Sequence, residues 1–276
     1  MIWFNGELIS ANEACVSPFD LGLTVGLGVF ETMAAYDGKV FAYNLHHARL
    51  IKSAEVFALP VPERSLITAA ITEVIDANHC HQGRYRIRVT LSGGVNQLGG
   101  GSEQGDVMVT ARPADSASGS DSAKLAWVPF VINERAATAG VKSTSYADHV
   151  LAYRHALNAG ADEALMLNSQ GHLAEASMSN VFVVKDSVVR TPSLASGCLP
   201  GVTRQLVIGL CADLDLPIME CQLGEQDIDN ADEIFLTSSL REIQAAALLG
   251  TEAREAGEVT VRLAEAYAEM VRKELS

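Results

Sequence analysis

The chain has 276 residues, and its 34 acidic and 20 basic residues give a formal net charge of −14. Nucleic acids and anionic membranes repel such a chain, so the charge argues against either as a partner. Hydrophobic residues make up 48% of the sequence, which excludes a disordered protein. The length predicts about two domains.

The first thirty residues contain three acids and no continuous apolar run, so we expect no secretory signal. No uncharged apolar stretch approaches the roughly 18 residues that a membrane helix needs. The five cysteines are scattered and form no CxxC pair, which argues against a disulfide framework and a zinc site. We therefore expect reduced thiols, no bound metal and a cytoplasmic location.

Residues 113–123 consist of small and polar side chains that cannot contribute to a core. They predict a linker between an N-terminal domain of residues 1–112 and a C-terminal domain of residues 124–276. In the first domain we expect strands over residues 1–9, 30–43, 84–91 and 105–111. A helix capped by Asn44 is expected to run to about residue 57, and a second covers residues 65–77.

After the linker, a strand is predicted over residues 124–132 and a helix over 147–159. Residues 163–168, 171–176, 180–185 and 187–191 predict a meander of strands, and a further short strand covers residues 231–236. Helices are expected over residues 203–214 and 259–275. Strands cluster without intervening helices, which favours antiparallel pairing. The predicted class is α+β and not a doubly wound sheet.

Four features could carry chemistry. Lys142 lies between a predicted strand and a helix, where partial desolvation would make its amine nucleophilic; an ordinary solvated lysine is the alternative. Glu175 is the one acid in an uncharged run, and could hold a proton on a pyridine nitrogen or be an exposed charge. Residues 199–204 begin a helix whose first amides could bind an anion, or form an ordinary Pro-Gly start. Arg49 could clamp a phosphate or pair with Glu55 or another acid.

Together these features resemble the class IV (fold type IV) pyridoxal-phosphate enzymes, which include branched-chain aminotransferases, D-amino-acid transaminases and 4-amino-4-deoxychorismate lyases. The matching segments run in family order: GLGVFET (26–32), the helix with Arg49, VKSTSY (141–146), ADEAL (161–165), Glu175 with SNVF (179–182), LPGVTR (199–204) and ADEIFLTSS (231–239). The resemblance implies a smaller N-terminal α/β sandwich domain and a larger, strand-rich pseudo-barrel domain. It also implies a homodimer.

The resemblance further implies pyridoxal 5′-phosphate as the cofactor, bound through a Schiff base to Lys142, whose amine then shuttles the α-proton. Glu175 matches the carboxylate on the pyridine nitrogen. The phosphate would be bound by residues matching Arg49, Val202, Thr203 and Ser239. Tyr146 resembles a tyrosine that bonds the phenolic oxygen, and Asn180 a supporting residue near the ring.

The substrate side is less defined by the sequence. Arg88 matches the strand where some members hold a carboxylate, but alternation places Arg84, Arg86 and Arg88 on one face, so spacing does not choose among them. The amides of Ser239 and Leu240 could also hold a substrate carboxylate. The expected substrate is a small amino acid or 2-oxo acid.

Departures from the family patterns bear on the activity. The strand that holds Arg88 ends Thr90-Leu-Ser-Gly-Gly, without the Arg-x-His of D-amino-acid transaminases or the Ser-Arg-Gly common in lyases. The leading hypothesis is a transaminase that moves an amino group between an amino acid and a 2-oxo acid. The alternatives are a 4-amino-4-deoxychorismate lyase that releases pyruvate and 4-aminobenzoate, and a non-catalytic binding protein that keeps the fold.

Overall fold

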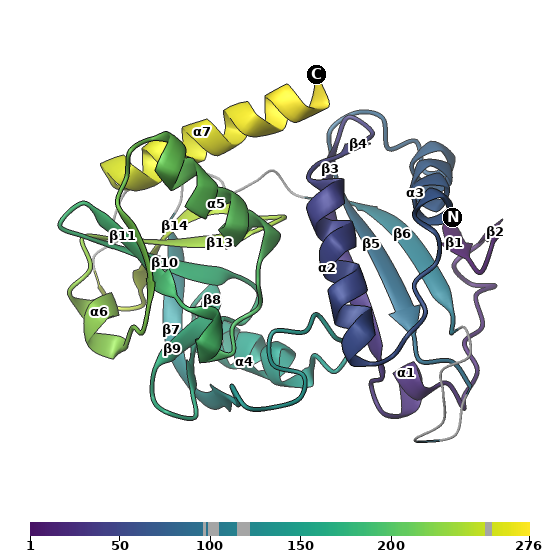
Figure 1. Cartoon of the computed structure of the whole chain (residues 1–276), viewed down its shortest axis with the longest axis horizontal. Coiled ribbons are helices and arrows are strands. Elements are labelled where there is room, and N and C mark those ends of the chain that lie inside the picture. The colour runs from purple at the N-terminus through teal and green to yellow at the C-terminus, as the bar shows by residue number, and fades with distance from the viewer. Residues whose placement is uncertain (96–97, 99–104, 115–121, 252–255) are drawn as a thin grey trace. The chain divides into compact units, whose positions relative to one another are not determined.

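The computed structural model describes residues 1–95, 98, 105–114, 122–251 and 256–276 (Figure 1). The chain divides into two compact units. Unit 1 consists of Met1–Ser116 with Val141–Tyr146 and Leu275, and unit 2 holds the remaining residues. Residues 115–121 of the predicted linker lie outside the described residues. The assignment of residues 141–146 to unit 1 was not foreseen, because the predicted domains were continuous in sequence.

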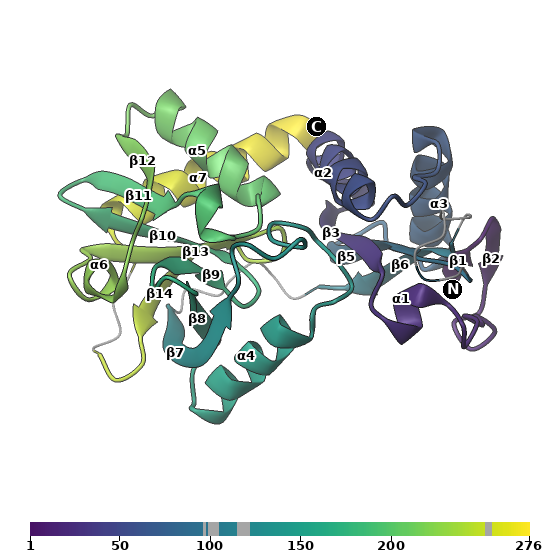
Figure 2. The same cartoon turned by 60° about the horizontal axis from the view of Figure 1, so that its bottom comes forward.

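Unit 1 is built on a six-stranded antiparallel sheet with the order β2-β1-β6-β5-β3-β4. Its strands are β1 (Ile2–Phe4), β2 (Glu7–Ile9), β3 (Gly28–Tyr36), β4 (Lys39–Val40), β5 (Arg84–Ser92) and β6 (Val107–Pro113). The short helix α1 (Leu21–Thr24) precedes β3. Helices α2 (Tyr43–Val56) and α3 (Arg64–Ala77) lie on one side of this sheet (Figure 2).

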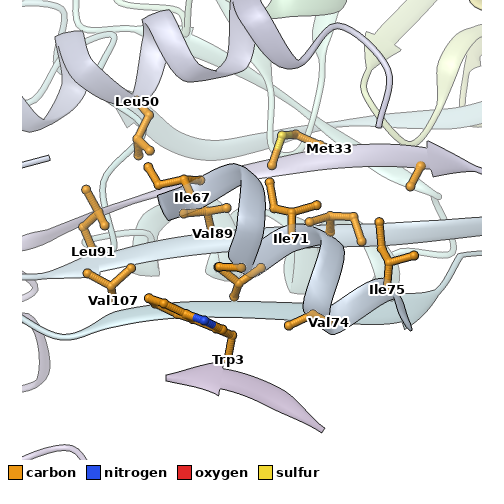
Figure 3. Packing of buried hydrophobic residues seen from close by; sticks show 14 of the residues in the cluster. Trp3, Met33, Leu50, Ile67, Ile71, Val74, Ile75, Val89, Leu91 and Val107 are labelled. Atoms are coloured by element: carbon orange, nitrogen blue, oxygen red, sulfur yellow. The ribbon is translucent and has the colours of Figure 1, made fainter. Parts of the chain in front are cut away.

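The alternating sequence of β5 explains this two-sided arrangement. Ile87, Val89 and Leu91 are buried and pack with apolar residues of α2 and α3, whereas the arginines point to the other face. Figure 3 shows Leu50 of α2 and Ile67, Ile71, Val74 and Ile75 of α3 gathered around Val89 and Leu91, with Trp3 at the edge. This core holds the strand that carries Arg88 rigidly in place.

Unit 2 is built on a curled eight-stranded sheet with the order β12-β11-β10-β13-β14-β7-β8-β9. Its strands are β7 (Ala123–Ile132), β8 (Glu163–Asn168), β9 (Leu173–Ala176), β10 (Asn180–Lys185), β11 (Val188–Pro192), β12 (Ile218–Cys221), β13 (Glu233–Ser238) and β14 (Glu242–Leu248). Neighbours pair antiparallel except β11–β12, β14–β7 and β7–β8. The outermost strand β9 also contacts β10, so the sheet curls back on itself.

Four helices and one 3₁₀ turn complete unit 2: α4 (Ala147–Asn158), η1 (Leu194–Ser196), α5 (Val202–Asp213), α6 (Glu225–Asp229) and α7 (Glu258–Leu275). In α7 the buried residues Val259, Leu263, Tyr267 and Val271 recur every four positions, which is the apolar stripe of a packed helix. In the described parts of the chain, no helix is long and apolar enough to cross a membrane.

The predicted α+β class is confirmed, and two local expectations are wrong. Asn44 does not cap α2: the helix begins at Tyr43 after Ala42, which has left-handed backbone angles, and the Asn44 side chain accepts a hydrogen bond from Arg64 instead. The predicted four-strand meander is interrupted, because β10 pairs with β13 and not with β9. Strand β14 was missed, since its Gln-Ala-Ala-Ala centre carries no alternation.

Candidate active site

Lys142 lies in an extended segment that adds to the edge of β3 in unit 1. The Phe30 amide donates to the Lys142 carbonyl over 3.0 Å, and the Thr144 amide donates to the Gly28 carbonyl over 2.8 Å. A bridge between Val29 and Ser143 completes the pairing. The lysine backbone is therefore fixed by a strand partner more than a hundred residues earlier in the chain.

Two glycines of the 26–32 motif allow this close approach. A Cβ on Gly26 would lie 2.3 Å from Ser145 Oγ, and a Cβ on Gly28 would lie 2.8 Å from Thr144 Oγ1. Gly26 also has φ +70°, a conformation that other residues rarely adopt. The hydroxyls of Thr144 and Ser145 both donate to the Gly26 carbonyl over 3.0 Å. Residues 26–30 therefore form the surface on which residues 142–145 pack.

The Phe30 ring brings three predicted residues together. Lys142 Nζ lies 4.5 Å from the ring centroid and Arg88 Cζ lies 3.7 Å from it. Tyr146 packs edge-on against the same ring, with centroids 5.5 Å apart. Cations are held over aromatic faces by the ring quadrupole. Phe30 is thereby in contact with the Lys142 amine and with the Arg88 guanidinium.

This arrangement distinguishes Arg88 from the neighbouring arginines. Arg84 lies over Tyr36 instead, and Arg86 is exposed. Burial, together with the positive charge of Arg86, lowers the pKa of the Arg88 guanidinium from its usual value. Arg86 stands directly opposite Arg112 on β6, and no acid pairs with Arg86, Arg88 or Arg112 among the residues that the structure describes.

Arg49 is buried and bound to an acid that the sequence did not single out. Its Nε donates to Glu31 Oε1 over 2.7 Å and its Nη2 donates to Oε2 over 2.8 Å. His46 Nδ1 lies 2.7 Å from the same Oε2. Burial raises the pKa of Glu31, but the charge and hydrogen bonds of Arg49 and His46 outweigh burial and bring it to about 2. Burial also lowers the pKa of His46, although its hydrogen bond to Glu31 acts in the opposite direction.

Glu175 lies in β9 of unit 2, and its side chain is 8% exposed. The Leu199 amide donates to Oε2 over 3.0 Å, and Asn180 Nδ2 lies 3.4 Å from the same oxygen. His149 Nε2 of α4 lies 3.3 Å from Oε1. Hydrogen-bonding groups therefore contact both oxygens of the Glu175 carboxylate. The alternative of an exposed charge at a strand end is wrong for Glu175.

The start of α5 lies next to this carboxylate. Asn180 Nδ2 donates to the Leu199 carbonyl over 2.9 Å, and a Cβ on Gly201 would lie 2.0 Å from Asn180 Oδ1. Gly201 precedes the helix, and no side chain caps it. Val202 and Thr203, the first two helical residues, are buried. The helix start therefore presents amides that suit an anion.

Ser239 and Leu240 form the turn between β13 and β14. Arg241 holds this turn: its amide donates to Ser238 Oγ over 3.1 Å, and its guanidinium lies 3.4 Å from the fully buried Glu163. Burial raises the pKa of Glu163 despite the nearby charge of Arg241. These contacts of Arg241, all within unit 2, hold the turn in place.

The structure sorts the predicted residues into two groups. Lys142, Tyr146, Arg49 and Arg88 belong to unit 1, and Glu175, Asn180, Val202, Thr203, Ser239 and Leu240 belong to unit 2. Sequence reasoning missed Glu31 and His149, which contact predicted residues directly. An acid inside the otherwise apolar β3 was the available signal for Glu31, whereas His149 had none beyond its place on the helix.

Comparison with known proteins decides the family. The model of the class IV amino-transferases matches residues 28–249. The chain belongs to the class IV aminotransferases. The branched-chain-amino-acid aminotransferase of Escherichia coli is 30% identical over 96% of this chain and 91% of its own length. The structure of a branched-chain aminotransferase from Thermoproteus uzoniensis with norvaline has a TM-score of 0.91 at 29% identity, over 99% of this chain and 95% of that one.

A Legionella pneumophila structure that is named as a putative 4-amino-4-deoxychorismate lyase is also similar. It has a TM-score of 0.83 at 25% identity, over 94% of this chain and 97% of that one. The predicted fold type IV architecture is confirmed by these neighbours. As a member of this family, the protein is a pyridoxal-phosphate-dependent transaminase, which agrees with the prediction from the sequence motifs.

Proposed function

We propose that Lys142 is the catalytic amine of this transaminase. The observation that carries the proposal is the position of Lys142 Nζ over the Phe30 ring, which Arg88 also contacts, on a backbone that β3 holds in place. Pyridoxal phosphate, when bound, supplies an aldehyde for covalent attachment and a ring that takes up the electrons left when a C–H bond breaks. Once the substrate amine has displaced it from the aldehyde carbon, the freed Lys142 Nζ would accept the substrate α-proton and return it to that former aldehyde carbon.

Glu175 is proposed to hold the proton on the pyridine nitrogen. The Leu199 amide and Asn180 hold its Oε2 in place, which leaves the carboxylate positioned to pair with a positively charged ring nitrogen. This role fits a carboxylate that is almost fully buried, because its charge then requires a partner.

The phosphate is proposed to bind Arg49, the amides of Val202 and Thr203, and Ser239. Arg49 remains charged in its ion pair with Glu31, and the start of α5 lacks a side-chain cap that would compete for its amides. Tyr146 is proposed to bond the phenolic oxygen of the cofactor, and Asn180 to support the ring site.

For the substrate, we propose an aliphatic amino acid and a 2-oxo acid. The named relatives act on branched-chain amino acids, and the aromatic rings of Phe30 and Tyr146 offer apolar contact beside Lys142. Arg88 is proposed to bind a substrate carboxylate, and the amides of Ser239 and Leu240 to bind another carboxylate group.

The 4-amino-4-deoxychorismate lyase is the second candidate. It is favoured by Arg86 and Arg88 on one sheet face without an acidic partner in the described chain, because this lyase substrate carries two carboxylates. The similar Legionella structure has the same fold. Both candidates use Lys142 and Glu175.

A half-reaction screen tests these proposals. The pyridoxal-phosphate-loaded enzyme is mixed with single L- and D-amino acids, and conversion of the cofactor to its amine form is followed by absorbance. A transaminase converts it with at least one donor and forms a 2-oxo acid. Pyruvate released from aminodeoxychorismate without an acceptor selects the lyase, and no reaction with any compound contradicts both.

The role of Lys142 has its own test. Lys142→Ala is expected to abolish the borohydride-reducible attachment of the cofactor and to lower turnover by several orders of magnitude. Lys52→Ala, an exposed lysine of α2, is the matched control and should behave as wild type. Retention of the covalent attachment in Lys142→Ala would refute the assignment.

A homodimer in the cytoplasm is also proposed. The five cysteines are free thiols, which agrees with a reducing compartment. The subunit number is measured by sedimentation equilibrium.

A further inference from the structure

His149 faces the carboxylate to which we assign the ring nitrogen. Its Nε2 lies 3.3 Å from Glu175 Oε1, while Leu199 and Asn180 hold Oε2. The orientation of the Asn180 amide is fixed, because its Nδ2 also donates to the Leu199 carbonyl over 2.9 Å. Hydrogen-bonding groups therefore contact both oxygens of the Glu175 carboxylate.

The packing of α4 directs His149 towards this position. Ala152 and Ala156 are fully buried and pack against Ala161, Ala164 and Met166. His149 precedes them by three and seven positions, so it continues the inward stripe of the helix. The small alanines bring α4 close to β8, and Met166 of β8 is paired with Glu175 of β9. The histidine thus reaches Glu175 from a rigid helix.

The chemistry of the contact makes His149 the donor. An ionised carboxylate can only accept, so Nε2 must carry a hydrogen. The imidazole is 23% exposed and the carboxylate 8%, so this hydrogen bond is shielded from most of the solvent. A shielded bond to a charged acceptor is stronger than one between neutral groups.

We propose that His149 is a positioning residue for Glu175: by donating Nε2–H to Oε1 it fixes the plane of the carboxylate that meets the pyridine nitrogen. The proposal rests on the proposed role of Glu175. Without this donor the carboxylate rotates about its side chain, and its alignment with the ring nitrogen must be restored each time the cofactor binds.

The test compares His149→Leu, which removes the donor, with His149→Gln, whose amide nitrogen can occupy the place of Nε2. The apoenzyme is titrated with pyridoxal phosphate and the Kd is measured by fluorescence. We expect His149→Leu to weaken binding about tenfold and His149→Gln to stay within about threefold of wild type. His155→Leu, an exposed histidine of the same helix, is the matched control and should leave the Kd unchanged. Equal Kd values for wild type and His149→Leu would overturn the proposal.

A double-mutant cycle separates this inference from the role of Glu175. In a Glu175→Gln background, His149→Leu should change the Kd by less than about twofold, because the acceptor charge is already lost. A tenfold effect that persists in this background shows that His149 acts independently of Glu175 and overturns the inference. If Glu175→Gln alone alters neither the Kd nor the absorbance spectrum of the bound cofactor, the proposed role of Glu175 fails.

Discussion

At the scale of single residues, the buried group of Glu31, Arg49 and His46 shows how unit 1 accommodates a buried cation. A buried arginine without a counter-charge is costly, and Glu31 removes this cost with two hydrogen bonds. Because both Nε and Nη2 are engaged, the guanidinium plane is set by β3 and α2 together. Glu31 therefore both neutralises the charge of Arg49 and sets the orientation of its guanidinium.

This ion pair predicts a pH dependence of stability. The pKa of Glu31 is lowered to about 2, so its contribution is complete above the unfolded pKa of about 4.3 and is lost as the pH falls towards 2. Glu31→Gln should lower the free energy of unfolding at pH 7 by about 3 kcal/mol. The difference in the free energy of unfolding between wild type and Glu31→Gln should become smaller between pH 5 and 2. Urea unfolding at each pH measures it.

Two controls apply to the Glu31 experiment. His46 also titrates, and its lowered pKa makes the folded state lose stability as the pH falls from near 6.5, so the Glu31 effect is taken from the difference between wild type and Glu31→Gln and not from the wild-type curve alone. Glu55 is an exposed acid of the same helix as Arg49, so Glu55→Gln should leave the free energy of unfolding nearly unchanged at every pH. A difference between wild type and Glu31→Gln that stays constant down to pH 2 would argue against an ionised Glu31.

The thiols give a second prediction at this scale. Burial raises the pKa of Cys198 and of Cys211 to about 11, and the charge of Glu175 adds to the effect at Cys198. Since the thiolate is the reactive form, both should resist iodoacetamide at pH 8, whereas the exposed Cys15 should react readily. Mass spectrometry of the native and urea-unfolded protein measures this, and rapid native labelling of Cys211 would contradict the burial argument.

At the scale of elements, the start of α5 depends on one glycine. A Cβ on Gly201 would overlap Asn180 Oδ1 at 2.0 Å, and Asn180 is tied to Leu199 and Glu175. Gly201→Ala is therefore expected to cost about 1–3 kcal/mol of stability and to weaken binding of pyridoxal phosphate. Thermal unfolding and cofactor titration measure the two effects.

The same helix supplies the control. Gly209 lies inside α5, and a Cβ there would meet nothing within 4 Å. Gly209→Ala should stabilise the protein by about 0.5–1 kcal/mol without changing cofactor affinity, because alanine favours the helix. If both variants were destabilised alike, loss of glycine as such, and not the contact with Asn180, would be responsible.

Elements with a strong local pattern could be predicted from the sequence, and those set by distant partners could not. The alternation of β5 and the four-residue stripe of α7 determine which side chains are buried wherever the element packs. The pairing of residues 141–146 with β3 is different, because Val29 and Ser143 lie far apart in the chain and neither segment signals the other. The position of Lys142 next to Phe30 follows from this distant pairing. For the same reason, motif order predicted the residue types of the candidate site but not the contacts of Glu31 or His149.

At the scale of the whole molecule, unit 1 is completed by residues 141–146, which the chain inserts between two parts of unit 2. The two tryptophans divide between the units: Trp3 is buried in the core of unit 1, and Trp127 lies in β7 of unit 2. In a Trp127→Phe variant, the fluorescence of Trp3 therefore reports the unfolding of unit 1. In a Trp3→Phe variant, the fluorescence of Trp127 reports the unfolding of unit 2. Multi-domain chains need not unfold in one step, so the two signals can differ.

Thr144→Val should lower the denaturant midpoint reported by Trp3 more than the midpoint reported by Trp127. Thr144 Oγ1 donates to the Gly26 carbonyl over 3.0 Å, so the change removes a bond inside unit 1 worth about 1 kcal/mol. Thr191→Val is the reciprocal control, because Thr191 Oγ1 donates to the Val181 carbonyl over 2.8 Å inside unit 2. It should shift chiefly the Trp127 signal. If Thr144→Val shifted only the Trp127 signal, the lysine segment would be stabilised by unit 2, and its assignment to unit 1 would be wrong.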